Sequence, residues 1–364
     1  MGNERLAAAH ERVAVGGPVR LTPLEIWAAF AGCLLLILYS GTRLSRYGEM
    51  IAVRTGLGGT WIGLGLVAAV TSLPELITGI SAVTIVGAPD LAVGDALGSC
   101  IFNLLILVVL DFVHHGESIY TRMRAGHSLS AAFGVIILGI VAGSLMLQQS
   151  FPIRIGHVGP YALLSIPLYA LAIRSVFHYE RRERPPPVEE MEEAVKARGM
   201  PPGLSLRQIY LRYAANALVI IGAGAALPII GKALAAAMGW EHTFVGTTFL
   251  ALATSVPEIV ICVEAVRIGA VDLAIGNLLG SNLFDLLILG LDDLAYLEGP
   301  LFAAASPQHL FTTITALTMT GIVAAGLTYR PRARLFRLVG WVSFGLLTLA
   351  LLNALVLFLL SSGA

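Results

Sequence analysis

The sequence is poor in charged residues. Only 13% of its 364 residues are Asp, Glu, Lys or Arg, whereas about a quarter are charged in soluble domains. The 23 basic and 23 acidic residues cancel, so no basic surplus favours nucleic acid as a partner. Hydrophobic residues make up 57% of the chain, and the mean hydropathy is +0.82. This composition is typical of a protein that crosses a lipid bilayer several times.

Cysteine is also scarce. The three cysteines, Cys33, Cys100 and Cys262, stand singly in apolar runs without CxxC or zinc-type spacing. They therefore exclude a disulfide framework and a cysteine-based metal centre. Residues 1–23 are polar for too long to be a signal peptide, so we expect an N-terminal polar segment followed by a first apolar span that directs targeting.

Long apolar runs fill most of the remaining chain. A helix of about 20 apolar residues crosses the hydrocarbon core of a membrane. We predict an all-α polytopic membrane protein in which 24–178 and 207–364 each form five helices, joined by a charged, proline-rich linker at 179–206. The ten predicted spans are near 24–42, 58–86, 90–112, 128–148 and 158–177, and then near 208–237, 243–268, 272–291, 309–328 and 335–361.

Lys and Arg are concentrated in alternate loops. Because basic residues favour the cytoplasmic side, the linker 179–206 is predicted to be cytoplasmic and both termini outside, although Arg5, Arg12 and Arg20 favour the opposite orientation. With five spans in each half, the second half begins on the opposite side of the cell membrane. The sequence thus predicts two inverted five-helix repeats, which is an architecture of secondary transporters.

One stretch of the chain occurs twice. Residues 64–107 and 246–289 both contain Thr-Ser-x-Pro-Glu followed by Gly-Ser-x-x-Phe-Asn or Gly-Ser-x-x-Phe-Asp. Each copy carries a glutamate, Glu75 or Glu258, inside an apolar run. A charge in hydrocarbon costs about 2.5–3.5 kcal/mol on insertion scales, so acids at this depth usually serve function.

A proline precedes each glutamate. Pro74 and Pro257 each remove a helical hydrogen bond and free the carbonyl four residues earlier, at Val70 or Ala253. Irregular helix at membrane depth is tolerated where protein or a watery cavity satisfies the backbone. We therefore expect each helix break to face a cavity.

A polar stripe follows each glutamate. Asn277, Ser281 and Asp285 recur every four residues, and Asp95, Ser99 and Asn103 repeat the pattern in the first copy. Carboxylate, amide and hydroxyl oxygens suit hard cations such as calcium and sodium. Bringing Glu75, Glu258 and Asp285 together would require cations to neutralise them.

At these residues the chain resembles the calcium/cation antiporter superfamily, specifically its sodium/calcium exchanger branch. The resemblance implies ten helices and a central site that is alternately open to the two faces. It further implies that Glu75 and Glu258 hold calcium, with calcium and sodium as transported ions and no covalent cofactor. The remaining metal-ligand positions carry over to Ala68, Thr71, Ser72, Ser99 and Asn103, and to Ala251, Thr254, Ser255, Ser281 and Asp285.

Some positions depart from the pattern of that branch. Asp95 stands where the pattern has asparagine, and we expect either a metal ligand at the rim of the site or an acid at a helix start. The proton-coupled branch favours glutamate at the positions of Ser99 and Ser281. The presence of serine therefore favours sodium as the coupling ion. Small residues beside glycine can also simply pack helices. We expect Asp111, Asp292 and Asp293 to be solvated helix ends.

The sequence predicts a sodium/calcium antiporter, and not an enzyme, that exports calcium by alternating access. A proton-coupled calcium antiporter, or one for another cation, is the alternative. An intramembrane aspartyl protease is disfavoured because the chain has no Tyr-Asp and no complete Gly-x-Gly-Asp, and a passive cation channel is a third possibility. The expected partners are calcium, sodium and the bilayer, without nucleic acid, for a monomer or weak oligomer.

Overall fold

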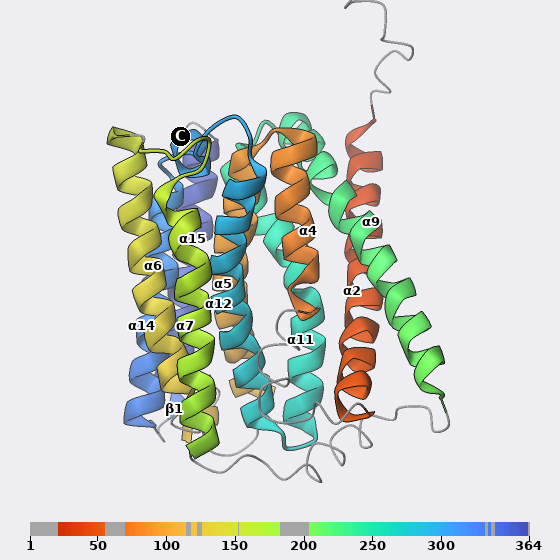
Figure 1. The fold of residues 1–364 in the computed structure, drawn as a ribbon. Helices are drawn as coiled ribbons and strands as arrows, with labels where there is room; N and C mark the ends of the chain where they lie inside the picture. The colour runs from red at the N-terminus through yellow and green to blue at the C-terminus, as the bar shows by residue number, and fades with distance from the viewer. Residues whose placement is uncertain are drawn as a thin grey trace, which may run out of the picture.

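The apolar runs form long helices in the computed structural model (Figure 1). The structure describes residues 21–54, 70–113, 118–121, 126–151, 153–182, 204–331, 334–335 and 339–362. Within these ranges, nine helices are long and apolar enough to cross a membrane. The all-helical membrane fold predicted from the sequence is therefore confirmed.

Within the described ranges, the first half has six helical segments and one short turn of 3-10 helix. They are α2 (Pro23–Arg54), α4 (Leu73–Ser81), the π-helix η2 (Ala82–Val86), α5 (Pro89–Val113), η3 (Ile119–Thr121), α6 (Gly126–Ser150) and α7 (Pro160–Arg182). The second half repeats this order, and several short elements are also described in it. They are α9 (Leu206–Met238), α10 (His242–Val245), the π-helix η4 (Gly246–Leu250), α11 (Ala251–Arg267), α12 (Val271–Ala295), α13 (Leu301–Ala304), α14 (His309–Tyr329), β1 (Arg334–Leu335), β2 (Val339–Gly340) and α15 (Trp341–Ser361).

The two halves are inverted relative to each other. The first helices of the halves, α2 and α9, pack side by side, and Figure 1 shows α2 starting at the upper end and α9 at the lower end. The direction is fixed by a hydrogen bond of 3.2 Å from Arg54, which ends α2, to the carbonyl of Leu204, just before α9. The packing also repeats, because α4 contacts α9 as α11 contacts α2.

The chain between α2 and α5 reaches from one end of the bundle to the other. Arg54 lies near the start of α9, whereas the carbonyl of Val86 accepts a hydrogen bond of 3.1 Å from Lys232 near the end of α9. Those ends are about 40 Å apart along the helix axis, since a helix rises 1.5 Å per residue. The tenth crossing stays a prediction, because residues 55–69 lie outside the described ranges.

The most deeply buried helices are α5 and α12. In their most apolar windows 67% and 83% of the residues are buried, compared with 33% in α2 and 28% in α7. α5 and α12 contact each other and are both contacted by α11 and α4. The duplicated polar stripes therefore lie on the two central helices of the bundle, while α2, α7 and α9 form parts of its outer surface.

Two predicted spans differ from the observed helices. The span predicted at 24–42 is part of a helix that continues to Arg54, because the basic residues beyond it stay on the helix: Arg46 pairs with Glu264 of α11, and Arg43 stacks on Tyr39. The span predicted from 335 begins only at Trp341, because β1 and β2 form a two-stranded antiparallel ribbon before it.

The chain ends of the described region fall on two faces of the bundle. In Figure 1, α2 begins and α15 ends at the upper end, whereas α7 ends and α9 begins at the lower end. Residues 1–20 and 183–203 lie outside the described ranges, and so do most of the predicted N-terminal segment and linker. The helix α7 continues to Arg182, within the predicted linker boundary.

Candidate functional site

The two glutamates stand on helices of different regularity. In the first half, Ser72 forms a turn just before α4, so that Pro74 and Glu75 lie in the first turn of that helix. In the second half, α11 continues through Pro257, and the irregular backbone is the π-helix Gly246–Leu250 before it. The prediction of a break at both prolines is therefore wrong for Pro257, whereas the first half does have an interruption.

Glu75 lies among hydroxyl groups from the other half of the protein. Its side chain is 1% exposed, and its Oε1 accepts a hydrogen bond of 3.4 Å from Ser255 of α11. The Ser255 hydroxyl also lies 3.2 Å from that of Ser99 on α5. Three of the predicted ligand residues thus meet across the interface between the halves.

Asp95 belongs to the same cluster. It is 1% exposed, and its Oδ1 accepts a hydrogen bond of 3.2 Å from Thr254. The acid in the first turn of α5 is Asp90, so Asp95 does not act as a helix-start acid. Thr254 also donates to the carbonyl of Ala251 at 3.3 Å, which places that carbonyl beside the cluster.

Glu258 has an equivalent environment in the other half-site. It is fully buried and interacts with Thr71, the counterpart of Thr254. The Thr71 hydroxyl is 3.5 Å from Oδ1 of Asn277 and 3.4 Å from the hydroxyl of Ser281. The two half-sites differ mainly in charge, because Asn277 occupies the place that Asp95 has in the first half.

Asn103 and Asp285 join the two half-sites. Nδ2 of Asn103 on α5 donates to Oδ2 of Asp285 on α12 at 3.2 Å, and both residues are buried. They are equivalent positions of the two repeats, 182 residues apart. Asp285 also repels the charges of Glu75, Glu258 and Asp95. The four acids therefore lie close enough for their negative charges to repel one another.

Glycines allow the central helices to approach one another. A Cβ on Gly94 would lie 2.9 Å from the backbone nitrogen of Thr247 in η4, and a Cβ on Gly98 would clash with the carbonyl of Thr247. Any side chain there would push the π-helix away from α5. The glycines thus let α5, with its polar stripe, pack directly against the π-helix.

Several buried oxygens of the site have no hydrogen-bond partner among the residues that the structure describes. They are Oε2 of Glu75, Oε1 and Oε2 of Glu258, Oδ2 of Asp95, Oδ1 of Asp285, Oδ1 of Asn103 and the hydroxyl of Ser72. Within the described residues, none of the four acids Glu75, Glu258, Asp95 and Asp285 forms a salt bridge with Lys or Arg. Acceptor oxygens without donors must meet either protons or metal cations.

The acids do not converge on one point. Among the described residues, no three Asp, Glu, His or Cys side chains come together at the geometry of a metal centre. Carboxylates instead alternate with Thr, Ser and Asn side chains. Of the predicted ligand positions, Ala68 lies outside the described ranges, and the other twelve are buried on α4, α5, α11 and α12 or in the turn before α4.

The aspartates at the ends of α5 and α12 contradict the prediction that they are solvated. Asp111 is fully buried and accepts hydrogen bonds from the backbone nitrogens of Ile119 at 3.1 Å and Gly340 at 2.7 Å. Its counterpart Asp293 is 4% exposed and accepts from Gly159 at 2.8 Å and Leu301 at 2.6 Å. Each aspartate thus ties its own loop to the other half.

Asp292 is also buried, but in a different environment. It is fully buried, and neither carboxylate oxygen has a hydrogen-bond partner. Its carboxylate lies against Gly79 of α4, where a Cβ would clash with it. Its counterpart in the first half is Leu110, so this acid occurs in one repeat alone. Its burial is not evident from the sequence, because it stands beside Asp293 at the end of an apolar helix.

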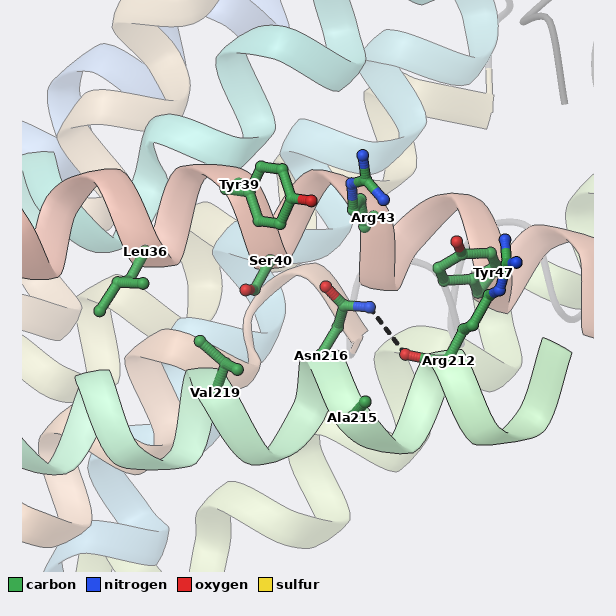
Figure 2. A pocket seen from close by; sticks show the side chains of 9 residues that line it. All are labelled: Leu36, Tyr39, Ser40, Arg43, Tyr47, Arg212, Ala215, Asn216 and Val219. Atoms are coloured by element: carbon green, nitrogen blue, oxygen red, sulfur yellow. Dashed lines mark hydrogen bonds between the residues drawn. The ribbon is translucent and has the colours of Figure 1, made fainter. Parts of the chain in front are cut away.

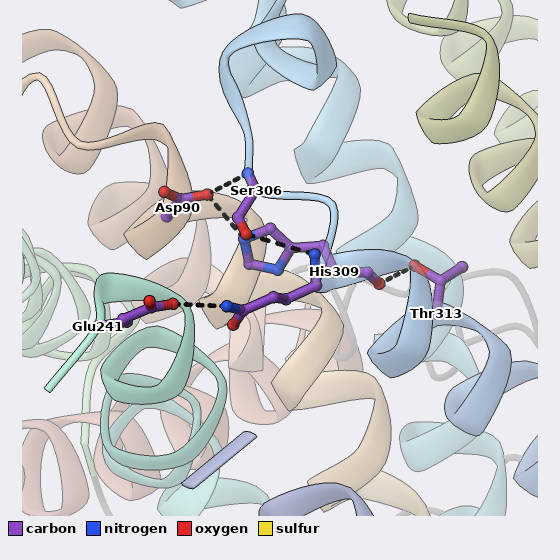
Figure 3. A network of polar contacts seen from close by, with 6 residues as sticks. Asp90, Glu241, Ser306, His309 and Thr313 are labelled. Carbon is purple, nitrogen blue, oxygen red and sulfur yellow. Dashed lines mark hydrogen bonds and ion pairs between the residues drawn. The ribbon is translucent and has the colours of Figure 1, made fainter. Parts of the chain in front are cut away.

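Two histidine–aspartate pairs mark the same pseudo-symmetry. His309 lies 3.1 Å from Asp90, and His127 lies 3.1 Å from Asp272. Figure 3 shows that Asp90 also accepts a hydrogen bond of 2.6 Å from the backbone nitrogen of Ser306. In the same loop, the side chain of Gln308 donates a hydrogen bond to Glu241. Each pair joins the two halves, and its members are 182 residues from their counterparts, a spacing that the sequence itself contains.

The comparison with known families agrees with this two-fold construction. The model of the sodium/calcium exchanger protein family matches residues 25–175 and again residues 210–358. The chain belongs to the sodium/calcium exchanger family. It is therefore a multi-pass membrane transporter and not an enzyme, and each half of it is one copy of the exchanger unit.

The chain is similar to proteins of bacteria and to solved exchanger structures. The inner membrane protein YrbG of Escherichia coli (strain K12) is 27% identical over 264 residues, covering 70% of this chain and 75% of YrbG. The structure of the sodium–calcium exchanger NCX_Mj has a TM-score of 0.58 at 18% identity, covering 91% of this chain and 98% of that one. The H+/Ca2+ exchanger CAX has a TM-score of 0.64 at 16% identity, covering 99% and 90%. The two solved structures show a shared fold.

Proposed function

We propose that this protein is a cation antiporter that exports calcium in exchange for sodium at the site between Glu75 and Glu258. The observation that supports it is the set of buried carboxylate and amide oxygens without hydrogen-bond donors. Calcium and sodium prefer oxygen ligands, both the charged oxygens of carboxylates and the neutral oxygens of amides. Membership of the sodium/calcium exchanger family points to the same class of cargo.

Competition for fixed negative charge couples the two ions. Glu75, Glu258, Asp95 and Asp285 hold up to four negative charges in a buried place, and the acids repel one another. One divalent ion or several monovalent ions can neutralise most of that charge, but both sets together cannot be accommodated favourably. Binding of sodium from one side therefore favours release of calcium to the other. If net charge moves, the membrane potential adds about 2.3 kcal/mol per charge per 100 mV.

The neutral hydroxyls favour sodium as the coupling ion. Ser99 and Ser281 stand on the two stripes, each within 3.5 Å of the threonine hydroxyl of the opposite half. Hydroxyls can bind a sodium ion but do not titrate in the physiological range. A proton-coupled exchanger would need a titrating group in these positions. Asp95 is the residue that favours this alternative, because it adds an acid to one half-site.

We also propose how the protein is oriented in the membrane. The linker 179–206 lies on the cytoplasmic side and both termini outside, because the basic loops of the first half and of the second half then face inward. The inverted halves give the protein two related arrangements, in which the site opens to one face or the other. The variant Arg330→Cys tests this assignment, because Arg330 follows the last turn of α14 on the same face as the linker. The measured quantity is the accessibility of the new cysteine from outside intact cells.

Calcium flux into proteoliposomes tests the proposed function. Radioactive calcium uptake is measured with an outward sodium gradient, with a proton gradient, and with neither. The proposal expects uptake that requires internal sodium and that is lost in Glu75→Gln and Glu258→Gln. Uptake driven by a proton gradient and indifferent to sodium would show that the alternative coupling is correct. Equilibration of calcium without any counter-ion would indicate a passive channel.

A further inference from the structure

A groove opens between α2 and α9 on the outer surface of the bundle (Figure 2). Both helices are candidate membrane spans, and they pack against each other. The groove has a volume of about 480 Å³ and is open along one side. This volume is within the range of about 300–1,000 Å³ that is usual for small-molecule sites.

The groove is apolar at one end and basic at the other. Figure 2 shows Leu36 and Val219 at one end, and Arg43 and Arg212 at the other. On each helix the arginine is seven residues from the aliphatic residue, or about 10 Å along the axis. Because α2 and α9 are antiparallel, both walls change from basic to apolar in the same direction.

Among the described residues, no acid lies at the basic end to neutralise it. None of the nine residues that line the groove is acidic. In the part of the chain that the structure describes, neither Arg43 nor Arg212 forms a salt bridge. The guanidinium of Arg43 lies 4.4 Å above the ring of Tyr39, which orients it at the rim. Two guanidinium groups in one groove complement a phosphate, which they bind through paired hydrogen bonds.

The basic end also lies nearer the membrane surface. Arg212 is six residues into α9, and Arg43 is 11 residues before the end of α2, so they are about 9 Å and 16 Å from the helix ends that meet at Leu204. Because both helices are candidate membrane spans, the apolar end lies about 10 Å deeper along the helix axes, toward the middle of the bilayer. A phospholipid has the same order, with its phosphate near the surface and its acyl chains below.

We propose that the groove between α2 and α9 binds an anionic phospholipid. Arg43 and Arg212 hold the phosphate, and one acyl chain lies along Leu36 and Val219. The absence of an acid among the lining residues makes an anionic headgroup more favourable than a zwitterionic one. Basic pockets between membrane helices are a recurrent form of headgroup site.

Native mass spectrometry of the delipidated, full-length protein in detergent tests this proposal with phosphatidylglycerol as the probe. We expect one phosphatidylglycerol to bind more tightly than phosphatidylcholine. Substitution of both arginines, Arg43→Gln with Arg212→Gln, should weaken phosphatidylglycerol binding at least about tenfold, since each charge-assisted contact contributes about that factor. The matched control is Arg174→Gln with Arg207→Gln, which removes two exposed arginines outside the groove and should leave binding unchanged.

A second variant separates the groove from charge alone. Val219→Trp fills the apolar end while keeping both arginines, and it should also weaken phosphatidylglycerol binding. If the double arginine variant does not fold, Val219→Trp alone tests whether the groove binds the lipid. Equal binding of phosphatidylcholine, displacement of the lipid by inorganic phosphate at similar concentration, or unchanged binding in Val219→Trp would each overturn the proposal. None of these readouts depends on calcium transport.

Discussion

Asp292 and Asp293 are neighbours in the sequence, but the same substitution should affect them differently. The two oxygens of Asp293 accept from Leu301 and Gly159. In Asp293→Asn one oxygen remains, so one buried backbone N–H must face the amide nitrogen. A buried donor without an acceptor costs about 1–3 kcal/mol, and the loss of charge weakens the other bond. The free energy of unfolding should therefore fall by about 2–4 kcal/mol.

Asp292 offers the opposite case. Neither of its oxygens accepts a hydrogen bond, and the side chain packs against Gly79. Asp292→Asn keeps the size of the side chain and breaks no hydrogen bond. We expect the free energy of unfolding to stay within about 1 kcal/mol of the parent protein, because a buried neutral amide and a buried carboxyl are similar in cost.

Unfolding of the two variants in mixed micelles, followed by far-ultraviolet circular dichroism, measures the difference. The expected order of stability is parent and Asp292→Asn together, and Asp293→Asn clearly lower. Asp111→Asn is the symmetry-related control and should resemble Asp293→Asn, since Asp111 also accepts from two backbone nitrogens. Equal loss of stability in Asp292→Asn and Asp293→Asn would refute the reasoning.

Three further predictions concern the site. Glu75→Gln and Glu258→Gln should each reduce sodium-dependent calcium uptake to background, and retention of half the parent rate in either would argue against a ligand role. Asp95→Asn restores the residue of the family pattern and should lower the Hill coefficient for sodium inhibition of calcium uptake; an unchanged coefficient would place Asp95 outside the sodium site. Gly98→Ala should destabilise the protein by about 1–3 kcal/mol through overpacking against η4, whereas Gly143→Ala, with open space around it, should be tolerated, as thermal unfolding can compare.

Much of the fold could be predicted from the sequence. The length of an apolar run decides whether a helix can cross a bilayer, and self-similarity of residues 64–107 and 246–289 is visible without any structure. An odd number of spans per half then requires inversion. The predicted end of the first span was wrong because Arg46, which suggests a loop by its charge, finds Glu264 on another helix and stays helical.

The candidate site could be located but not assembled from the sequence. The duplicated motif identified Glu75 and Glu258, but the pairing of Thr254 with Asp95 and of Ser255 with Glu75 depends on how the halves cross. The path of the backbone at Pro257 was also not predictable. Gly41 on α2 makes room for the ring of Pro257, so α11 continues through it.

The sequence by itself determined that the chain is a duplicated membrane protein with acids inside its helices, because hydropathy and internal repetition are properties of the chain. The tertiary structure alone decided which of those acids are satisfied. Asp293 meets two backbone nitrogens whereas Asp292 beside it meets none, although both are aspartates at one helix end. Part of each environment comes from a residue more than a hundred positions away, Gly159 for Asp293 and Gly79 for Asp292, and local sequence carries no record of such contacts.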